Sequence, residues 1–448
     1  MNNYINYEAQ ASTIQIEDIT SDKDNASILR RLKRNDPDLT ELRLTRVHLA
    51  SDDGDYCPDS AHELGWFGYY IGKNTTVREL CLRSSVVEGF STAIEPFCRG
   101  LRKNTSIKEI VFVDFAGGEH FQLLGSFFRN NELAVIELEL DTCDLGADGC
   151  RLLTSAICEC KGTLEHVAIC NESHHEDIYG GQLANLLVAL SMHPHLITLQ
   201  LSGSIIGRNE CKTLATVLRC TTTKLHTLNL DRSNIGNTGM NDVGAAVANS
   251  KLLRNLSLRG NDIGDEGVDV LTHALIHSST LQLLDMSTNR SITNKGWQTL
   301  STLLTTPNSS LEELVLCENI LDDEGALIFA SALANNCKLK KLSLWDNAIA
   351  AKGWSAFSKL LCEPSSVNKT FLSNHTLQDI CISSPFANDR ERDTPDNVKS
   401  FLSLNKGADE KQVAITKILT YHALIRMGLQ SDATCHWIFP KSCCLSPN

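Results

Sequence analysis

Apolar residues recur along the chain in a frame of the form LxxLxLxxN. The clearest copy runs from Leu253 to Asn261. The second leucine of the frame stands at positions 228, 256, 284, 314 and 342, so that successive copies are 28, 28, 30 and 28 residues apart. Weaker copies lie upstream, and a last one begins at Val367, which makes a series of twelve. Because one frame returns in phase, we interpret most of the chain as a repeat array.

Each copy of the frame predicts a short strand, a turn and a helix. The LxL alternation buries the leucines and exposes the residues between them. The asparagine at the turn offers a side-chain amide to neighbouring backbone groups, and Cys143, Ser204 and Ser233 take its place in some copies. Apolar residues at helical spacing follow glycines 267, 296, 325 and 353. Since no such unit buries its apolar side alone, the units must stack.

These residues resemble the ribonuclease-inhibitor-like subfamily of leucine-rich repeat proteins over residues 37–378. The resemblance implies an α/β solenoid shaped as a horseshoe, with parallel strands on the concave face and helices on the convex face. It also implies that the concave face and the loops beside it bind proteins.

The two ends of the chain depart from the frame. Residues 1–36 contain a helical run at 25–34 and are interpreted as an N-terminal cap, because a solenoid needs its terminal apolar faces covered. Residues 379–448 are interpreted as C-terminal capping helices and a tail. Their segment 400–422 also resembles the closing helices of ribonuclease-inhibitor-like proteins from unicellular algae. Longer intervals place insertions at 50–62 and 171–181, which are either specificity loops or tolerated drift.

The composition and the N-terminal sequence limit the cellular compartments in which we expect the protein. The chain is 42% hydrophobic and 21% charged, but it has no apolar run of the ~20 residues that a membrane span needs. The N-terminus lacks the features of a signal peptide, so we expect the cytosol or nucleus. The 17 cysteines, such as Cys81 and Cys158, read as small buried apolar residues. The sequons at Asn74, Asn104 and Asn374 are then coincidental. A net charge of −13 argues against general nucleic-acid binding.

The exposed strand positions of the first four repeats are acidic. This surface is expected to attract a basic or polar segment of a partner protein. The alternative is a solvated face that binds nothing. The residues concerned are Glu41, Glu79, Glu109, Glu137, Glu139 and Asp141.

A second candidate surface centres on Trp345, which the frame places on an exposed strand position. An aromatic side chain there is typical of a binding hot spot. Asp231, Arg259, Glu313 and Phe371 are near enough in repeat order to share the surface. The alternative is that the C-terminal segment of the chain covers Trp345.

Little in the sequence points to chemistry. The paired histidines at 174, 175, 193 and 195 lack the spacing of a zinc site. The chain contains no GxxxxGK[ST], GxGxxG or GxSxG, which removes sequence support for nucleotide binding or a nucleophilic serine. We therefore predict no catalytic residue, no metal and no cofactor.

The predicted function is a non-enzymatic scaffold or sensor that binds a protein or peptide on its concave face, without nucleic acid or membrane, as a monomer. One alternative is a Ran-type GTPase-activating protein, whose repeats are similar, although this sequence lacks the long acidic tail of that family. Another is the sensor region of an innate-immunity-type receptor, against which stands the absence of a nucleotide-binding domain before the repeats.

Overall fold

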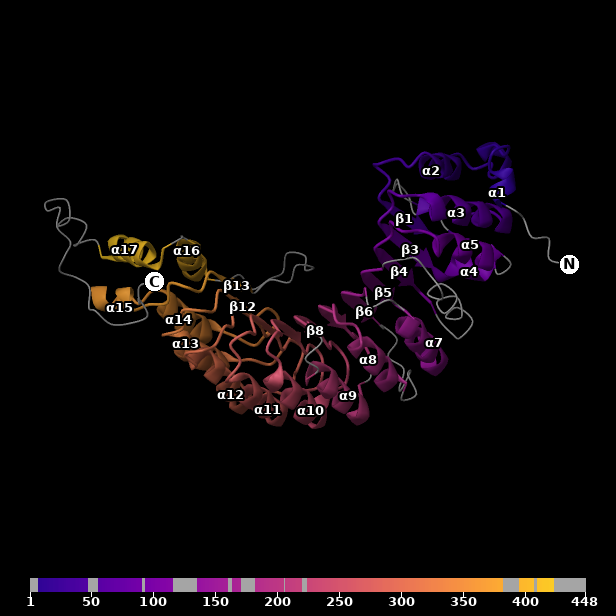
Figure 1. Ribbon diagram of the computed structural model, residues 1–448. Coiled ribbons are helices and arrows are strands. Elements are labelled where there is room, and N and C mark those ends of the chain that lie inside the picture. The colour runs from indigo at the N-terminus through magenta and orange to yellow at the C-terminus, as the bar shows by residue number, and fades with distance from the viewer. Residues whose placement is uncertain are drawn as a thin grey trace. The chain divides into compact units, whose positions relative to one another are not determined.

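The computed structural model describes residues 7–46, 55–90, 93–115, 135–159, 163–170, 182–204, 206–219, 224–381, 395–406 and 409–422. These residues fall into two compact units, Met1–Asn234 and Ile235–Asn448. In each unit, parallel strands alternate along the chain with helices, and the strands form one layer while the helices form another (Figure 1). The prediction of an α/β solenoid is confirmed.

The first unit contains a parallel sheet whose strand order is β2-β1-β3-β4-β5-β6-β7-β8. The middle apolar residues of the frame pair in register, for example Leu80 with Ile110 and Ile110 with Leu138. The strands are β1 (Glu41–Leu44), β2 (Asp55–Tyr56), β3 (Glu79–Arg83), β4 (Glu109–Val113), β5 (Glu137–Asp141), β6 (His166–Cys170), β7 (Thr198–Gln200) and β8 (Thr227–Asn229). The helices include α1 (Tyr7–Gln10), α2 (Lys23–Lys33), α3 (Ala61–Lys73), α4 (Ser84–Gly89), α5 (Ile94–Leu101), α7 (Gly146–Glu159), α8 (Leu183–Ser191) and α9 (Arg208–Arg219).

The second unit repeats the arrangement with the strand order β9-β10-β11-β12-β13. Here Leu256, Leu284, Leu314, Leu342 and Ile380 pair in register. The strands are β9 (Asn255–Ser257), β10 (Leu283–Asp285), β11 (Glu313–Val315), β12 (Lys341–Ser343) and β13 (Asp379–Cys381). The helices include α10 (Gly236–Asn249), α11 (Asp265–Leu275), α12 (Asn294–Thr305), α13 (Asp323–Leu333), α14 (Ala351–Leu361), α15 (Val367–Phe371), α16 (Asp396–Asn405) and α17 (Glu410–Tyr421).

The asparagines at the turns connect neighbouring repeats, as the frame predicts. Asn289 Nδ2 donates to the carbonyls of Leu258, Met286 and Ser287 at 3.0–3.1 Å. Its Oδ1 accepts from the backbone N–H groups of Asn261 and Ile263. We call the series Asn261, Asn289, Asn319 and Asn347 the turn ladder. In the first unit, Cys143 Sγ and Ser233 Oγ stand at the position of the asparagine and donate to carbonyls of the preceding repeats. They therefore replace some of the hydrogen bonds that the asparagine side chain makes in other repeats.

The glycines near the helix starts are explained by a close approach between repeats. Asp265 Oδ1 accepts from the N–H groups of Thr293 at 2.8 Å and Gly296 at 3.0 Å, and thereby caps the start of α12 from the neighbouring helix. A Cβ atom on Gly296 would lie 2.4 Å from that same Oδ1. The position therefore needs a residue without a side chain.

A second series of asparagines lies where the helices end, and sequence reasoning missed it. Asn104 Nδ2 donates to the carbonyls of Ile71 and Asn74, while its Oδ1 accepts from the N–H groups of Ser106 and Ile107. Asn74 in the first unit and Asn336 and Asn374 in the second do the same work. We call these four residues the helix-end ladder. The three sequons interpreted as coincidence are thus part of this buried ladder, which gives the N-x-S/T pattern a structural origin.

Several other predictions need correction. The twelfth frame is wrong, because Val367–Phe371 forms helix α15 and the last strand is β13 at Asp379–Cys381. The insertion at 50–62 is more than a loop, since β2 pairs with β1 and α3 begins at Ala61. Cys158 is exposed and Cys81 half-buried, whereas Cys143 and Cys150 are buried as expected. The insertion at 171–181 lies outside the described residues.

The helix predicted at 25–34 is confirmed as α2. Asp22 caps it by accepting from the N–H groups of Asp24 and Asn25. The apolar side of α2, including Leu29 at 0% and Leu32 at 1% exposure, is buried in the first unit. Asn25 also bonds to Glu63 of α3, which fastens α2 to the first repeat.

Candidate functional site

The acidic residues predicted on the first repeats lie together on the strand layer of the first unit. Glu41 pairs in register with Glu79, Glu79 with Glu109, and Glu109 with Glu137. Neighbouring parallel strands are about 4.8 Å apart, so these four carboxylates form a continuous row across β1, β3, β4 and β5. We call them the carboxylate ladder. Glu139 and Asp141 follow on β5, and their register partners on β4 are Val111 and Val113.

The carboxylate ladder is electrostatically strained. Partial burial, followed by repulsion from Glu137 and Glu79, raises the pKa of Glu109 to about 7. Burial and the charge of Glu41 raise the pKa of Glu79, and burial and Asp141 raise that of Glu139. Within the described part of the chain, no ladder carboxylate forms an ion pair. A basic group placed here would relieve the repulsion.

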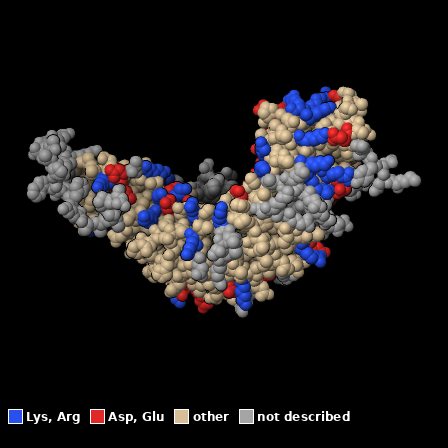
Figure 2. Space-filling model, in the orientation of Figure 1, with Lys and Arg blue, Asp and Glu red and all other residues tan. Residues whose placement is uncertain are grey.

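Most basic residues of the helices in the first unit lie at the C-terminal ends of those helices, while Arg43 on β1 and Arg83 on β3 lie on the strand layer. Cations are favoured at the C-terminal end of a helix because the helix dipole is negative there. Figure 2 shows blue side chains over the helices of this unit. Several already pair with acids, as Arg102 does with Glu95 at 2.9 Å and Lys73 with Glu8 at 2.7 Å. The helix ends carry Arg30, Arg31, Lys33, Arg34, Lys73, Arg99, Arg102 and Lys103.

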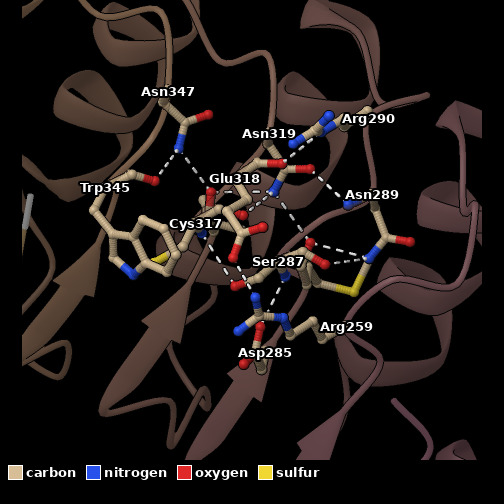
Figure 3. Close-up of polar contacts among 12 residues, drawn as sticks. Arg259, Asp285, Ser287, Asn289, Arg290, Cys317, Glu318, Asn319, Trp345 and Asn347 are labelled. Atoms are coloured by element: carbon tan, nitrogen blue, oxygen red, sulfur yellow. Dashed lines mark hydrogen bonds and ion pairs between the residues drawn. The ribbon is translucent and has the colours of Figure 1, made fainter. Parts of the chain in front are cut away.

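The second candidate surface lies at the end of strands β9 to β12, in the second unit. Arg259 forms an ion pair with Glu318, which stands two repeats further along the chain (Figure 3). The side chains are 30% and 19% exposed, so the pair is partly shielded from water. The repeat between them carries only small residues here, Ser287 and Thr288, which leaves room for the pair to cross. We call Arg259, Glu318 and Trp345 the Arg259 cluster.

Trp345 is half-buried and firmly held by its backbone. Its carbonyl accepts from the N–H of Glu318 at 2.9 Å and from Asn347 Nδ2 at 3.4 Å. Figure 3 shows its indole directed away from Asn347. The C-terminal tail that was the alternative cover for Trp345 lies outside the described residues beyond position 422. Trp345 thus combines a backbone that is fixed by two hydrogen bonds with an aromatic side chain that is partly exposed.

The structure unites some of the other predicted residues and separates others. Glu313 lies on β11 and approaches Lys341 of β12 at 3.5 Å, on the same layer as Arg259. Asp231 follows β8 in the first unit, where its N–H donates to Asn229 Oδ1. Phe371 is excluded from the strand layer because it ends α15. Sequence reasoning missed Glu318, which directly follows Cys317, a position that the frame predicts to be exposed and that the structure buries.

No described feature adds a metal site or a membrane span. Among the residues described, no group of three or more His, Cys, Asp or Glu side chains is placed to hold a metal ion. In that same part of the chain, no helix combines the length and apolarity required to cross a bilayer.

Comparison with known proteins agrees with the repeat structure. A family model for the leucine-rich repeat matches residues 249–271. NACHT, LRR and PYD domains-containing protein 14 of Mus musculus is 30% identical over 61% of this chain and 27% of its own length. The corresponding protein 5 of Homo sapiens is 32% identical over 42% of this chain and 16% of its own length. The chain thus spans about a quarter or less of these two relatives.

Among solved structures, leiomodin-1 actin-binding site 2 matches with a TM-score of 0.29 and 15% identity, over 42% of this chain and 95% of that one. A score this low carries no argument about function.

Proposed function

We propose, from the premise that this chain is a leucine-rich repeat protein, that it is a non-enzymatic scaffold or sensor whose strand layers bind a protein partner. Its relatives carry repeats of this kind beside NACHT and PYD domains, which favours the sensor interpretation over a GTPase-activating one. Stacked repeats hold many side chains in fixed positions, and preorganisation lowers the entropic cost of binding.

The observation that carries the proposal is the carboxylate ladder. Four glutamates stand in register on adjacent strands, and burial together with repulsion from the neighbouring carboxylates raises the pKa of Glu79 and Glu109. Such a row stabilises the free protein poorly. A partner segment rich in Lys or Arg would supply the missing charge, so we propose a basic protein segment as the occupant of this face.

A charge-removal variant tests this proposal. Full-length chain carrying Glu79→Gln, Glu109→Gln and Glu137→Gln is compared with wild type for binding a labelled Lys/Arg-rich peptide and for capture of proteins from native extract. We expect about tenfold weaker peptide binding, equivalent to about 1.4 kcal/mol, and loss of basic proteins from the captured set. The control carries Glu266→Gln, Asp269→Asn and Glu324→Gln, which are exposed on helices of the second unit. Equal binding by both variants would overturn the assignment of this face.

The Arg259 cluster supplies a second contact region in the proposal. A tryptophan held by its backbone and flanked by an ion pair has the composition of a hot spot. Trp345→Ala is expected to weaken capture of the natural partner about tenfold or more. The exposed Leu327→Ala, on a helix of the same unit, serves as the apolar control. Adding wild-type chain to GTP-loaded small GTPases tests the alternative function, since a pure binder leaves their hydrolysis rates unchanged.

A further inference from the structure

The helix-end ladder of the second unit continues through a lysine. Asn374 Nδ2 donates to the carbonyl of Leu333, the last residue of α13, and to the carbonyl of Asn336, both at 2.9 Å. One rung later the donor is Lys417 of α17. Its Nζ donates to the carbonyl of Leu361, the last residue of α14, at 2.6 Å and to that of Asn374 at 3.0 Å. Lys417 therefore takes the place of the next asparagine.

Asn405, the next asparagine at a helix end, does not fill this position. Its Nδ2 donates to the carbonyl of Leu377 at 2.6 Å and more weakly to that of Asn374 at 3.3 Å. The carbonyl at the end of α14 thus depends on Lys417. Helix α17 is attached to the end of the unit by the buried Lys417, by an apolar side that includes Val413, Ala414 and Ile418, and by more exposed polar contacts of Glu410 and His422.

The third bond of Lys417 runs to a histidine. Lys417 is 0% exposed, and its Nζ lies 3.1 Å from His375 Nδ1. His375 Nε2 lies 3.0 Å from the carbonyl of Phe371, which only accepts, so Nε2 carries the proton and Nδ1 accepts from Lys417. The ammonium thereby uses all three of its donors. A second proton on His375 would make Nδ1 a hydrogen-bond donor that faces the donating Nζ of Lys417, and this hydrogen bond would be lost.

Among the described titratable groups, Cys362 acts on Lys417 with an opposing charge when its thiol is ionised, and burial raises the pKa of that thiol, so that it offers little counter-charge near neutral pH. The turn after α14 contributes Cys362 and Glu363, and α17 contributes Tyr421 and His422. His422 bonds to Thr370, and Glu410 at the start of α17 accepts from Thr376. Among the described residues, the hydrogen-bond partners of Lys417 Nζ are two carbonyls and His375. Added positive charge on His375 would therefore act directly on Lys417.

We propose that α17 is a proton-sensitive plug on the end of the second unit: Lys417 completes the helix-end ladder, and protonation of His375 expels it. Burial, aided by the charge of Lys417, lowers the pKa of His375 to about 4, and burial lowers the pKa of Lys417 to about 7. Both groups bind protons more weakly when α17 is docked. Docking therefore weakens as the pH falls between 6.5 and about 4 through His375, in the range where Lys417 is the charged ammonium that makes all three bonds.

Hydrogen exchange of the full-length chain tests the plug. The amide protection factors of residues 410–421, corrected for the intrinsic pH dependence of exchange, are compared at about pH 7.5 and about pH 5. The histidine alone is expected to reduce them roughly 30-fold, the ratio that a pKa moving from 6.5 to about 4 gives at about pH 5. The amides of β10 and β11 serve as the internal reference and should keep their protection.

Two variants separate the proton effect from a loss of folding. His375→Gln keeps an amide that accepts from Lys417 and donates to Phe371 but does not titrate, so most of the loss at low pH should disappear. Lys417→Met should lower the protection of α17 already at about pH 7.5, whereas Lys411→Met, exposed on the same helix, should not. Identical pH profiles for wild type and His375→Gln would overturn the proposal, as would full protection of α17 in Lys417→Met.

Discussion

At the residue scale, the molecule depends on polar side chains that serve two repeats at once. Leucines alone do not fix the spacing between repeats, because apolar contacts have no direction. The turn ladder and the helix-end ladder supply directional bonds where each strand and each helix would otherwise leave backbone groups without partners. Their amides both donate and accept, so replacing one leaves several buried groups unsatisfied.

The contribution of the helix-end ladder to stability can be tested at Asn336, with its exposed neighbour Asn335 as the control. Asn336 is 9% exposed, donates to the carbonyl of Leu304 and accepts from the N–H groups of Lys338 and Leu339. Asn336→Ala should lower the free energy of unfolding by about 3 kcal/mol, since three buried bonds are lost. Asn335→Ala, at an exposed neighbour, should change it by less than about 0.5 kcal/mol. Urea unfolding monitored by circular dichroism measures both, and equal losses would contradict the ladder.

At the element scale, several helix starts of the second unit depend on the helix before them. Asp265 lies at the start of α11, yet it caps α12 through the N–H groups of Thr293 and Gly296 and through the Thr293 hydroxyl. Asp323 does the same for α14 through Ala350 and Gly353. The helices are therefore coupled at their N-terminal ends as well as through their apolar sides.

Removing one such cap should loosen the next helix rather than the helix that carries it. Asp265→Ala is expected to cost about 1–2 kcal/mol, the usual value of an N-cap, and to increase hydrogen exchange in the first turn of α12. Asp269→Ala, exposed on the same helix, should leave α12 unchanged. Faster exchange confined to α11 in the Asp265 variant would contradict this coupling.

The frame predicted most strands because its period and its alternation agree. It failed at the end of the array, where residues 363–372 are inserted. Val367, Thr370 and Leu372 imitate the frame at the expected interval, while the true strand carries a better copy, Leu377-x-x-Ile380. At this point the period and the pattern disagree, and the period alone predicts the wrong location for Phe371, which ends α15. The carboxylate ladder was predictable because register follows directly from the frame, whereas the Lys417 contact joins residues 42 and more positions apart and leaves no periodic signal.

At the scale of the whole molecule, charge is distributed so that one face of the first unit opposes folding slightly. The carboxylate ladder concentrates negative charge on the strand layer, while many basic residues lie at the helix ends. A binding surface often costs stability in this way, since groups arranged for a partner are imperfectly satisfied without it. Because the pKa of Glu109 is raised, this cost can be measured as a pH dependence of the free energy of unfolding.

Glu109 should make the first unit less stable as the pH rises. Its folded-state pKa is raised to about 7 from 4.5, so the folded chain binds this proton more tightly than the unfolded chain. The free energy of unfolding is therefore expected to fall between about pH 5 and about pH 7.5 through this group. Glu109→Gln should be more stable than wild type at about pH 8, and the difference should shrink to near zero at about pH 4. Urea midpoints at the two pH values measure the difference, with Glu165→Gln, outside the ladder, as control. If the carboxylate ladder receives a basic partner, saturating partner should abolish the advantage of Glu109→Gln, because the bound cations stabilise the same charged carboxylate that folding alone disfavours.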